Sequence, residues 1–189
     1  MSVQKDNIYN AAAILFRDKG YKATSMRTLA TAVGLEVSSL YSHIRSKEEI
    51  LQDICLKNVE HFNLKMQDVM LSNTTNTEKL KALIEYHVQV AMEDVTSVTI
   101  FNNEWRNLSE PHLSSFLENR KNYERQFMDI IKDGIEQGEF SQIDPTVTFY
   151  MIFTSIRWIH FWYKPSRSLT QTAVIQNVIA MIFNGLSPK

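Results

Sequence analysis

The chain has 189 residues and a mass of 22.0 kDa, and 44% of its residues are hydrophobic. This length and composition predict a globular protein with a substantial core, built as one medium domain or as a small domain joined to a larger one. The single cysteine, Cys55, excludes an intramolecular disulfide, and no clustered Cys and His residues offer a zinc site, which is typical of a cytoplasmic protein.

The formal net charge at pH 7 is −1, which by itself argues against a nucleic-acid partner. The charge is unevenly distributed, however. Residues 1–47 contain seven basic and three acidic side chains, whereas the remainder contains 13 basic and 18 acidic side chains. A basic N-terminal segment on an acidic body is expected where one end of a protein contacts phosphate. The alternative is that charge clusters by chance in a short window.

Apolar residues recur at intervals of three and four along nearly the whole chain, which predicts an all-α protein. We expect about nine helices, over the approximate ranges 8–19, 26–33, 37–43, 46–70, 77–94, 97–107, 110–137, 145–163 and 170–185. Neither a secretory signal nor a membrane span is predicted, because the N-terminal segment carries charge and the longest uncharged run, 168–188, contains several amide and hydroxyl side chains.

Helix boundaries in the N-terminal quarter have clear local signals. Gly20 and Gly34 are placed as helix stops, and Ser46 followed by Glu49 has the spacing of a capping box. The pattern divides the chain into a short N-terminal helical part over 1–47 and a larger helical part over 48–189. Within the second part, the turn-rich stretch 71–77 is the best linker.

The two short helices on either side of Gly34 form the pattern of a helix-turn-helix motif. A recognition helix needs short hydrogen-bonding side chains on its outward face, and Ser38, Ser39, Ser42 and His43 meet that need. Val37 is suited to a thymine methyl, whereas Tyr41 and Lys47 are suited to phosphate and Arg27 to phosphate or base. The alternative is that these are ordinary surface residues of a three-helix bundle.

Residues 14–51 resemble the N-terminal DNA-binding domain of the tetracycline-repressor (TetR) family. The resemblance is carried by Phe16, Gly20, Tyr21, Thr24, Ser25, Met26, Leu29, Ala30, Gly34, Leu35, Leu40, Tyr41, His43, Ile44, Lys47, Glu48 and Leu51. It implies a homodimeric transcriptional regulator, usually a repressor. The helix-turn-helix DNA-binding domain would cover 1–47, and a helical ligand-binding and dimerisation domain over 48–189 would bind a small molecule and form the dimer interface. It also implies that the DNA contacts are Arg27, Val37, Ser38, Ser39, Tyr41, His43 and Lys47.

The last two predicted helices, 145–163 and 170–185, are apolar on more than one face. A helix that is apolar nearly all round must be covered on two sides, and a chain of this size has too few other helices to cover both. The pattern therefore predicts a homodimer through a four-helix interface built from these two segments.

Aromatic residues in the C-terminal part are candidates for an effector pocket, although such a stripe at helical spacing is more often plain core. Polar side chains embedded among them favour the pocket, and a buried Arg157 would need an anionic partner, either Glu104, Glu124 or a ligand. The candidate ligand-binding residues are His87, Phe101, Glu104, Trp105, Tyr123, Phe127, Phe153, Arg157 and Trp158.

Residues 119–170 are similar to one branch of the TetR family. The similarity lies in Arg120, Tyr123, Glu124, Gly134, Gly138, Phe140, Asp144, Pro145, Trp158, Trp162, Tyr163, Pro165 and Leu169. That branch regulates fatty-acid catabolism in response to acyl-CoA thioesters, which implies a small hydrophobic effector such as a fatty acyl-CoA. The alternative is a repressor of a multidrug efflux gene that senses cationic hydrophobic compounds, in which Glu104 would pair with the drug.

An enzyme is the contrasting class. The glycines form neither a phosphate-binding loop nor a nucleophile elbow, and the histidines are too scattered to form a catalytic or metal-binding group. We therefore expect no catalytic residue, no metal and no cofactor. A helical scaffold that does not bind DNA is a third class, but it leaves the basic N-terminal segment unexplained.

Overall fold

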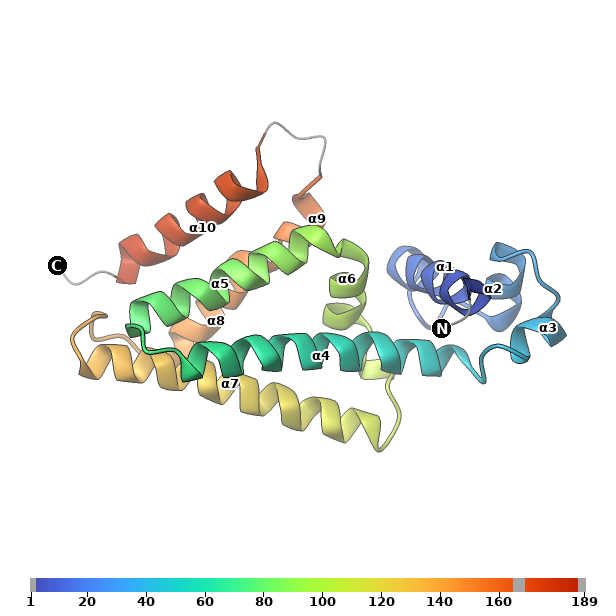
Figure 1. Ribbon diagram of the computed structural model, residues 1–189, viewed down its shortest axis with the longest axis horizontal. Coiled ribbons are helices and arrows are strands. Elements are labelled where there is room, and N and C mark those ends of the chain that lie inside the picture. The colour runs from blue at the N-terminus through green and yellow to red at the C-terminus, as the bar shows by residue number, and fades with distance from the viewer. Residues whose placement is uncertain (1–2, 165–168, 187–189) are drawn as a thin grey trace. The chain divides into compact units, whose positions relative to one another are not determined.

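The computed structural model describes residues 3–164 and 169–186, and over these residues the chain is entirely helical (Figure 1). The all-α prediction is confirmed. The elements are α1 (Val3–Lys19), α2 (Met26–Ala32), α3 (Val37–Tyr41), α4 (Lys47–Leu71), α5 (Asn76–Glu93), α6 (Val95–Asn103), the 3-10 helix η1 (Trp105–Asn107), α7 (His112–Glu136), α8 (Pro145–Arg157), α9 (Ile159–Trp162) and α10 (Gln171–Leu186).

Two predicted helices are each divided in the structure. The segment 97–107 becomes α6 and η1, because the Glu104 carbonyl accepts both the backbone N–H of Asn107 (2.9 Å) and its side-chain amide (3.1 Å). The segment 145–163 becomes α8 and α9, which are separated at Trp158, whose indole Nε1 donates to the Ser155 carbonyl.

The chain forms two compact units, and residues of α4 and α7 belong to both. The first unit contains the residues up to Glu60 and Thr96–Glu118, and the second contains His61–Val95 and the residues from Asn119 onward. The division at residue 47 into a DNA-binding and a ligand-binding domain stays a prediction.

The first unit has its own hydrophobic core, to which α1, α2 and α3 contribute fully buried side chains such as Phe16, Leu29 and Leu40. The loop between α1 and α2 begins at Gly20, where φ is +85°, so the predicted stop is a left-handed residue that favours glycine. Ser25 caps α2 by accepting a hydrogen bond from the backbone N–H of Thr28 (3.0 Å).

In the second unit, α5 packs against α8, α9 and α10. Its N-terminus is fixed twice. Thr75 and Glu78 form a capping box, and the Glu139 carboxylate accepts the backbone N–H groups of Asn76 (3.0 Å) and Thr77 (2.7 Å). Two free amides at the start of α5 are thus satisfied by a residue that lies just beyond α7.

The start of α5 also depends on close packing beside Glu139. A Cβ atom added to Gly134 of α7 would lie 2.3 Å from the ring of Phe140, so only glycine lets this buried ring lie against the helix. Within the described ranges, no helix is long and apolar enough to cross a lipid bilayer.

We predict that Glu139→Gln destabilises the protein by about 1–2 kcal/mol, because the neutral amide replaces one of two charge-assisted acceptors with a donor at the start of α5. Urea unfolding followed by circular dichroism measures the loss. Glu136→Gln, at an exposed position at the end of α7, is the matched control and should change the free energy of unfolding by less than about 0.5 kcal/mol. Equal stability of the two variants would contradict this account of the cap.

Candidate DNA-binding and effector sites

Helix α3 presents short hydroxyl side chains and one tyrosine to solvent. Ser38 and Ser39 are exposed, and 53% of Tyr41 is exposed although it is a large aromatic residue. The helix ends at Tyr41, two residues earlier than predicted, where Ser42 Oγ donates to the Ser39 carbonyl (2.7 Å). Leu40 faces the core, so the same short helix is anchored on one side and open for contacts on the other.

The remaining predicted DNA contacts differ in their surroundings. Arg27 is exposed on α2, whereas Val37 is half-buried and packs against the core of the first unit. His43 follows α3 and is also half-buried. Arg27 is therefore exposed to solvent, as the α3 hydroxyls are, whereas the side chains of Val37 and His43 are only partly exposed.

Lys47 has internal partners that the sequence analysis missed. Its ammonium donates to the carbonyls of Tyr21 (2.6 Å) and Thr24 (2.8 Å) and lies 4.1 Å from the centre of the Tyr21 ring. Burial lowers the pKa of Lys47, and the charge of Glu104 opposes that shift. Lys47 thus fastens the first turn of α4 to the loop between α1 and α2, and its predicted phosphate contact stays a prediction.

An aromatic cluster in the second unit surrounds a polar pair. His87 on α5 and Tyr123 on α7 share a hydrogen bond of 2.8 Å between Nε2 and the phenol oxygen. The His87 ring stacks on Phe62 at 4.5 Å between ring centres and meets Phe153 edge-on at 4.9 Å. Burial lowers the pKa of His87 to about 3 and raises that of Tyr123, so both side chains are neutral near pH 7.

The cluster continues from this pair toward α8. Phe127 contacts Phe149 and Phe153 with ring centres 5.4 and 5.2 Å apart. The structure thus brings together four predicted ligand-binding residues, His87, Tyr123, Phe127 and Phe153. Phe62 and Phe149 belong to the same cluster but were not predicted as ligand-binding residues. The spacing of four residues between Phe149 and Phe153 on α8 could have added Phe149, whereas Phe62 lies on α4 and has no spacing signal relative to His87 on α5.

Three other predicted ligand-binding residues lie in the first unit. Phe101 and Trp105 pack on Phe116, with ring centres 5.4 and 5.5 Å away. The Glu104 carboxylate accepts a hydrogen bond from the side-chain amide of Asn107 (2.8 Å). These side chains form part of the core of that unit or support its 3-10 turn.

The expected burial of Arg157 is wrong for the single chain, in which its side chain is exposed. Glu124, one of its expected partners, instead accepts a hydrogen bond from Arg120 (2.8 Å). Trp158 is also exposed, at 42%, and packs against Trp162 with ring centres 5.1 Å apart. The reason is that α8 is apolar on two sides, and the sequence does not say which of them faces the core.

Large apolar side chains are exposed on α8, α9 and α10. The exposed fractions are 61% for Val147, 53% for Tyr150, 67% for Met151, 64% for Phe161 and 80% for Met181. Large apolar side chains exposed on elements that pack together, as α8 and α10 do, are typical of a protein–protein contact.

Both parts of the chain match known sequence families. Residues 8–54 match the family described as "Bacterial regulatory proteins, tetR family", and residues 73–186 match "Tetracyclin repressor-like, C-terminal domain". The chain belongs to the TetR family. The helix-turn-helix of the first unit is therefore the DNA-binding motif of a transcriptional regulator, in agreement with the resemblance seen in residues 14–51.

Three TetR-family relatives are similar over almost the whole chain. The HTH-type transcriptional repressor KstR2 of Mycolicibacterium smegmatis is 27% identical over 97% of this chain and 91% of its own. The structure of the ketosteroid transcriptional regulator KstR2 of Mycobacterium tuberculosis is 25% identical, has a TM-score of 0.91 and covers 100% of this chain and 97% of its own. The structure of AibR in complex with isovaleryl coenzyme A and operator DNA is 25% identical, has a TM-score of 0.81 and covers 95% of this chain and 98% of its own.

We predict that His87 makes folding stability depend on pH. Its pKa is about 3 in the folded chain and near 6.5 when exposed, so the unfolded chain binds more protons between these values. Stability then falls as pH decreases below 6.5, by up to about 1.4 kcal/mol per pH unit.

Urea unfolding at pH 7.5, 6.0 and 5.0 tests this for the unaltered protein and for His87→Gln, which cannot titrate but can keep the hydrogen bond to Tyr123. The variant should lose less stability between pH 7.5 and 5.0 than the unaltered protein. The same loss in both proteins would show that His87 is not the group responsible.

Proposed function

We propose that this TetR-family regulator is a homodimeric repressor that binds a palindromic operator and is released from it by an acyl-CoA effector. The observation that carries the DNA-binding part is the outward face of α3, where Ser38, Ser39 and Tyr41 are all exposed. The repressor assignment is supported by the similarity to KstR2, which is described as a transcriptional repressor.

In this proposal Ser38 and Ser39 hydrogen-bond to base edges in the major groove, and Tyr41 donates to a phosphate. Arg27 and His43 add contacts beside α3, and Val37 offers its exposed part to a thymine methyl. Lys47 keeps its hold on the α1–α2 loop and has one further ammonium N–H for phosphate. Two recognition helices about 34 Å apart read successive major grooves of the palindrome.

The apolar surface of α8, α9 and α10 supports the homodimer. Tyr150, Met151 and Phe161 are each more than half exposed in the single chain, and a second copy that packs on them removes this apolar area from water. This is the interface that the sequence predicts for segments 145–163 and 170–185. Arg157, exposed beside Trp158, then lies at or near the contact between the two copies.

The effector proposal rests on the neutral aromatic interior of the second unit. An acyl chain is apolar, and its thioester is an uncharged polar group that matches the single His87–Tyr123 pair among the rings. The similarity to AibR, whose structure contains isovaleryl coenzyme A, supports the same class of effector. Residues His87, Tyr123, Phe127 and Phe153 are the proposed acyl-binding residues.

A cationic drug is the second candidate, and the structure favours it less. Glu104, the carboxylate expected to pair with such a drug, belongs to the first unit and already accepts a hydrogen bond from Asn107. The rings around His87 offer no carboxylate among the described contacts, and His87 itself is kept neutral. A buried cation would have no anionic partner among these described contacts.

In this proposal the effector releases the protein from DNA by shifting the population from a DNA-binding state to a state that cannot bind the operator. The acyl chain separates rings that are packed against one another. The second unit rearranges as a result, and the protein in this rearranged state does not bind the operator. Helix α4 contributes residues to both units and is the proposed carrier of this change. To shift the population from 1:99 to 99:1, the effector must bind the released state more tightly by about 5.5 kcal/mol.

We predict that Ser39→Ala and Tyr41→Phe each weaken operator binding by about thirtyfold, since each removes one hydrogen bond worth about 1 kcal/mol from both copies of the dimer, about 2 kcal/mol in all. Fluorescence anisotropy on DNA from upstream of the protein's own gene, at two salt concentrations, measures the affinity. Ser114→Ala, an exposed hydroxyl on α7, is the matched control. Light scattering should show an unchanged dimer for all variants. Unaltered affinity of both α3 variants would rule out α3 as the recognition helix.

We predict that a long-chain acyl-CoA below its micelle concentration abolishes operator binding, whereas the lipophilic cation tetraphenylphosphonium does not. The physical reason is that the aromatic interior offers a neutral hydrogen-bonding pair, and the described ring contacts around that pair include no carboxylate. The readout is the same anisotropy assay. Release by the cation alone would contradict the acyl-CoA assignment and support the drug-sensing alternative.

A further inference from the structure

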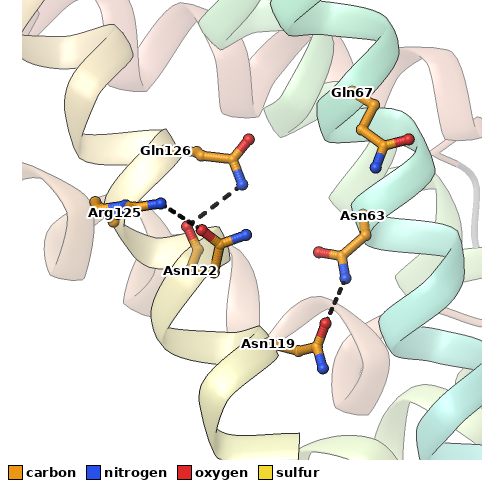
Figure 2. A pocket seen from close by; sticks show the side chains of 6 residues that line it. All are labelled: Asn63, Gln67, Asn119, Asn122, Arg125 and Gln126. Carbon is orange, nitrogen blue, oxygen red and sulfur yellow. Dashed lines mark hydrogen bonds between the residues drawn. The ribbon is translucent and has the colours of Figure 1, made fainter. Parts of the chain in front are cut away.

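A polar groove lies between α4 and α7 in the second unit (Figure 2). Its volume is about 500 Å³, which is within the range of small-molecule sites. Two amides come from α4, and three amides and one guanidinium come from α7. The lining side chains are Asn63, Gln67, Asn119, Asn122, Arg125 and Gln126.

Hydrogen bonds within the groove orient its side chains. Asn63 Nδ2 donates to Asn119 Oδ1 across the two helices (3.0 Å), and an Arg125 guanidinium N–H donates to Asn122 Oδ1 (2.7 Å). The Asn63 amide oxygen and the Asn122 amide nitrogen are not used in these two bonds. Gln67 has no hydrogen-bond partner among the described residues. The groove thus combines partly fixed amides with unused donors and acceptors.

The groove and the aromatic cluster use neighbouring residues of the same two helices. Asn63 follows Phe62 on α4, and Asn122 precedes Tyr123 on α7. Phe62 and Tyr123 are buried, whereas Asn63 is half-buried and Asn122 exposed. A ligand in the groove therefore lies on the outer side of the helices whose inner sides form the cluster around His87.

The chemistry of the lining selects a class of ligand. Carboxamides match the donor and acceptor edge of adenine, and a guanidinium binds phosphate oxygens. No carboxylate belongs to the groove as the described residues define it, so a negatively charged ligand meets one cation and no anion. A molecule with an adenine ring and phosphates satisfies both kinds of side chain.

We propose that the amide groove binds the adenine nucleotide end of a coenzyme A thioester, with its phosphate on Arg125 and its base against the amides of α4 and α7. This inference rests on the proposed function, in which the acyl end enters the aromatic cluster. It assigns the polar end of the effector to residues that neither the DNA-binding nor the acyl-binding proposal uses.

The test is isothermal titration of coenzyme A, without an acyl group, into the full-length protein and into Arg125→Gln and Asn122→Leu variants. Each variant should bind coenzyme A at least fivefold more weakly. Lys132→Gln, which removes the same charge from an exposed position of α7 outside the groove, should bind it as the unaltered protein does. Failure of coenzyme A to bind, or equal affinity in all four proteins, would overturn the assignment.

Operator release by a long-chain acyl-CoA, measured on the same four proteins, separates this inference from the proposed function. If the unaltered protein is released and the groove variants respond at the same concentration, the groove assignment is wrong and the effector proposal stands. If coenzyme A binds in an Arg125-dependent manner but no acyl-CoA releases the operator, the groove is a nucleotide site and the effector proposal is wrong.

Discussion

The interior of the second unit depends on keeping one titratable pair uncharged. His87 and Tyr123 hydrogen-bond to each other inside a set of aromatic rings, and burial shifts both pKa values toward the neutral forms. A charge at this place would lose its hydration without gaining a partner. In the proposed function, ring contacts give way to a long apolar chain and the pair hydrogen-bonds to an uncharged polar group, whereas the described contacts of the pair include no carboxylate to balance a cation.

The first unit is organised around a different polar contact. The Lys47 ammonium holds the carbonyls of Tyr21 and Thr24, so the first turn of α4 is fixed to the loop that precedes α2. Because α2 and α3 pack on one another, this contact also determines where the exposed face of α3 lies relative to the start of α4. Lys47, which the sequence suggests as a phosphate contact, thus also fixes the geometry of the DNA-binding motif through contacts inside the first unit.

Helix spacing made the all-α fold predictable, and Gly20 and Gly34 end their helices where the sequence indicates, both with positive φ. Four members of the group around His87 were among the nine predicted ligand-binding residues, because a histidine on an apolar face and aromatic residues at helical spacing are visible in sequence. The hydrogen bond between His87 and Tyr123 was not predicted, because this pairing depends on how α5 packs against α7. The burial of Arg157 was wrong because an all-round apolar helix does not reveal its solvent side. The amide groove was missed because uncharged amides on two separate helices leave no periodic signal in either.

The account is tested most directly by measuring operator release with a series of saturated acyl-CoAs of increasing chain length, each kept below its micelle concentration. If the acyl chain enters the aromatic interior of the second unit, each added CH₂ contributes about 0.8 kcal/mol, so potency rises about fourfold per carbon until the interior is filled. Potency that does not change with chain length would contradict the account, because the chain would then remain in water while only the polar end is bound.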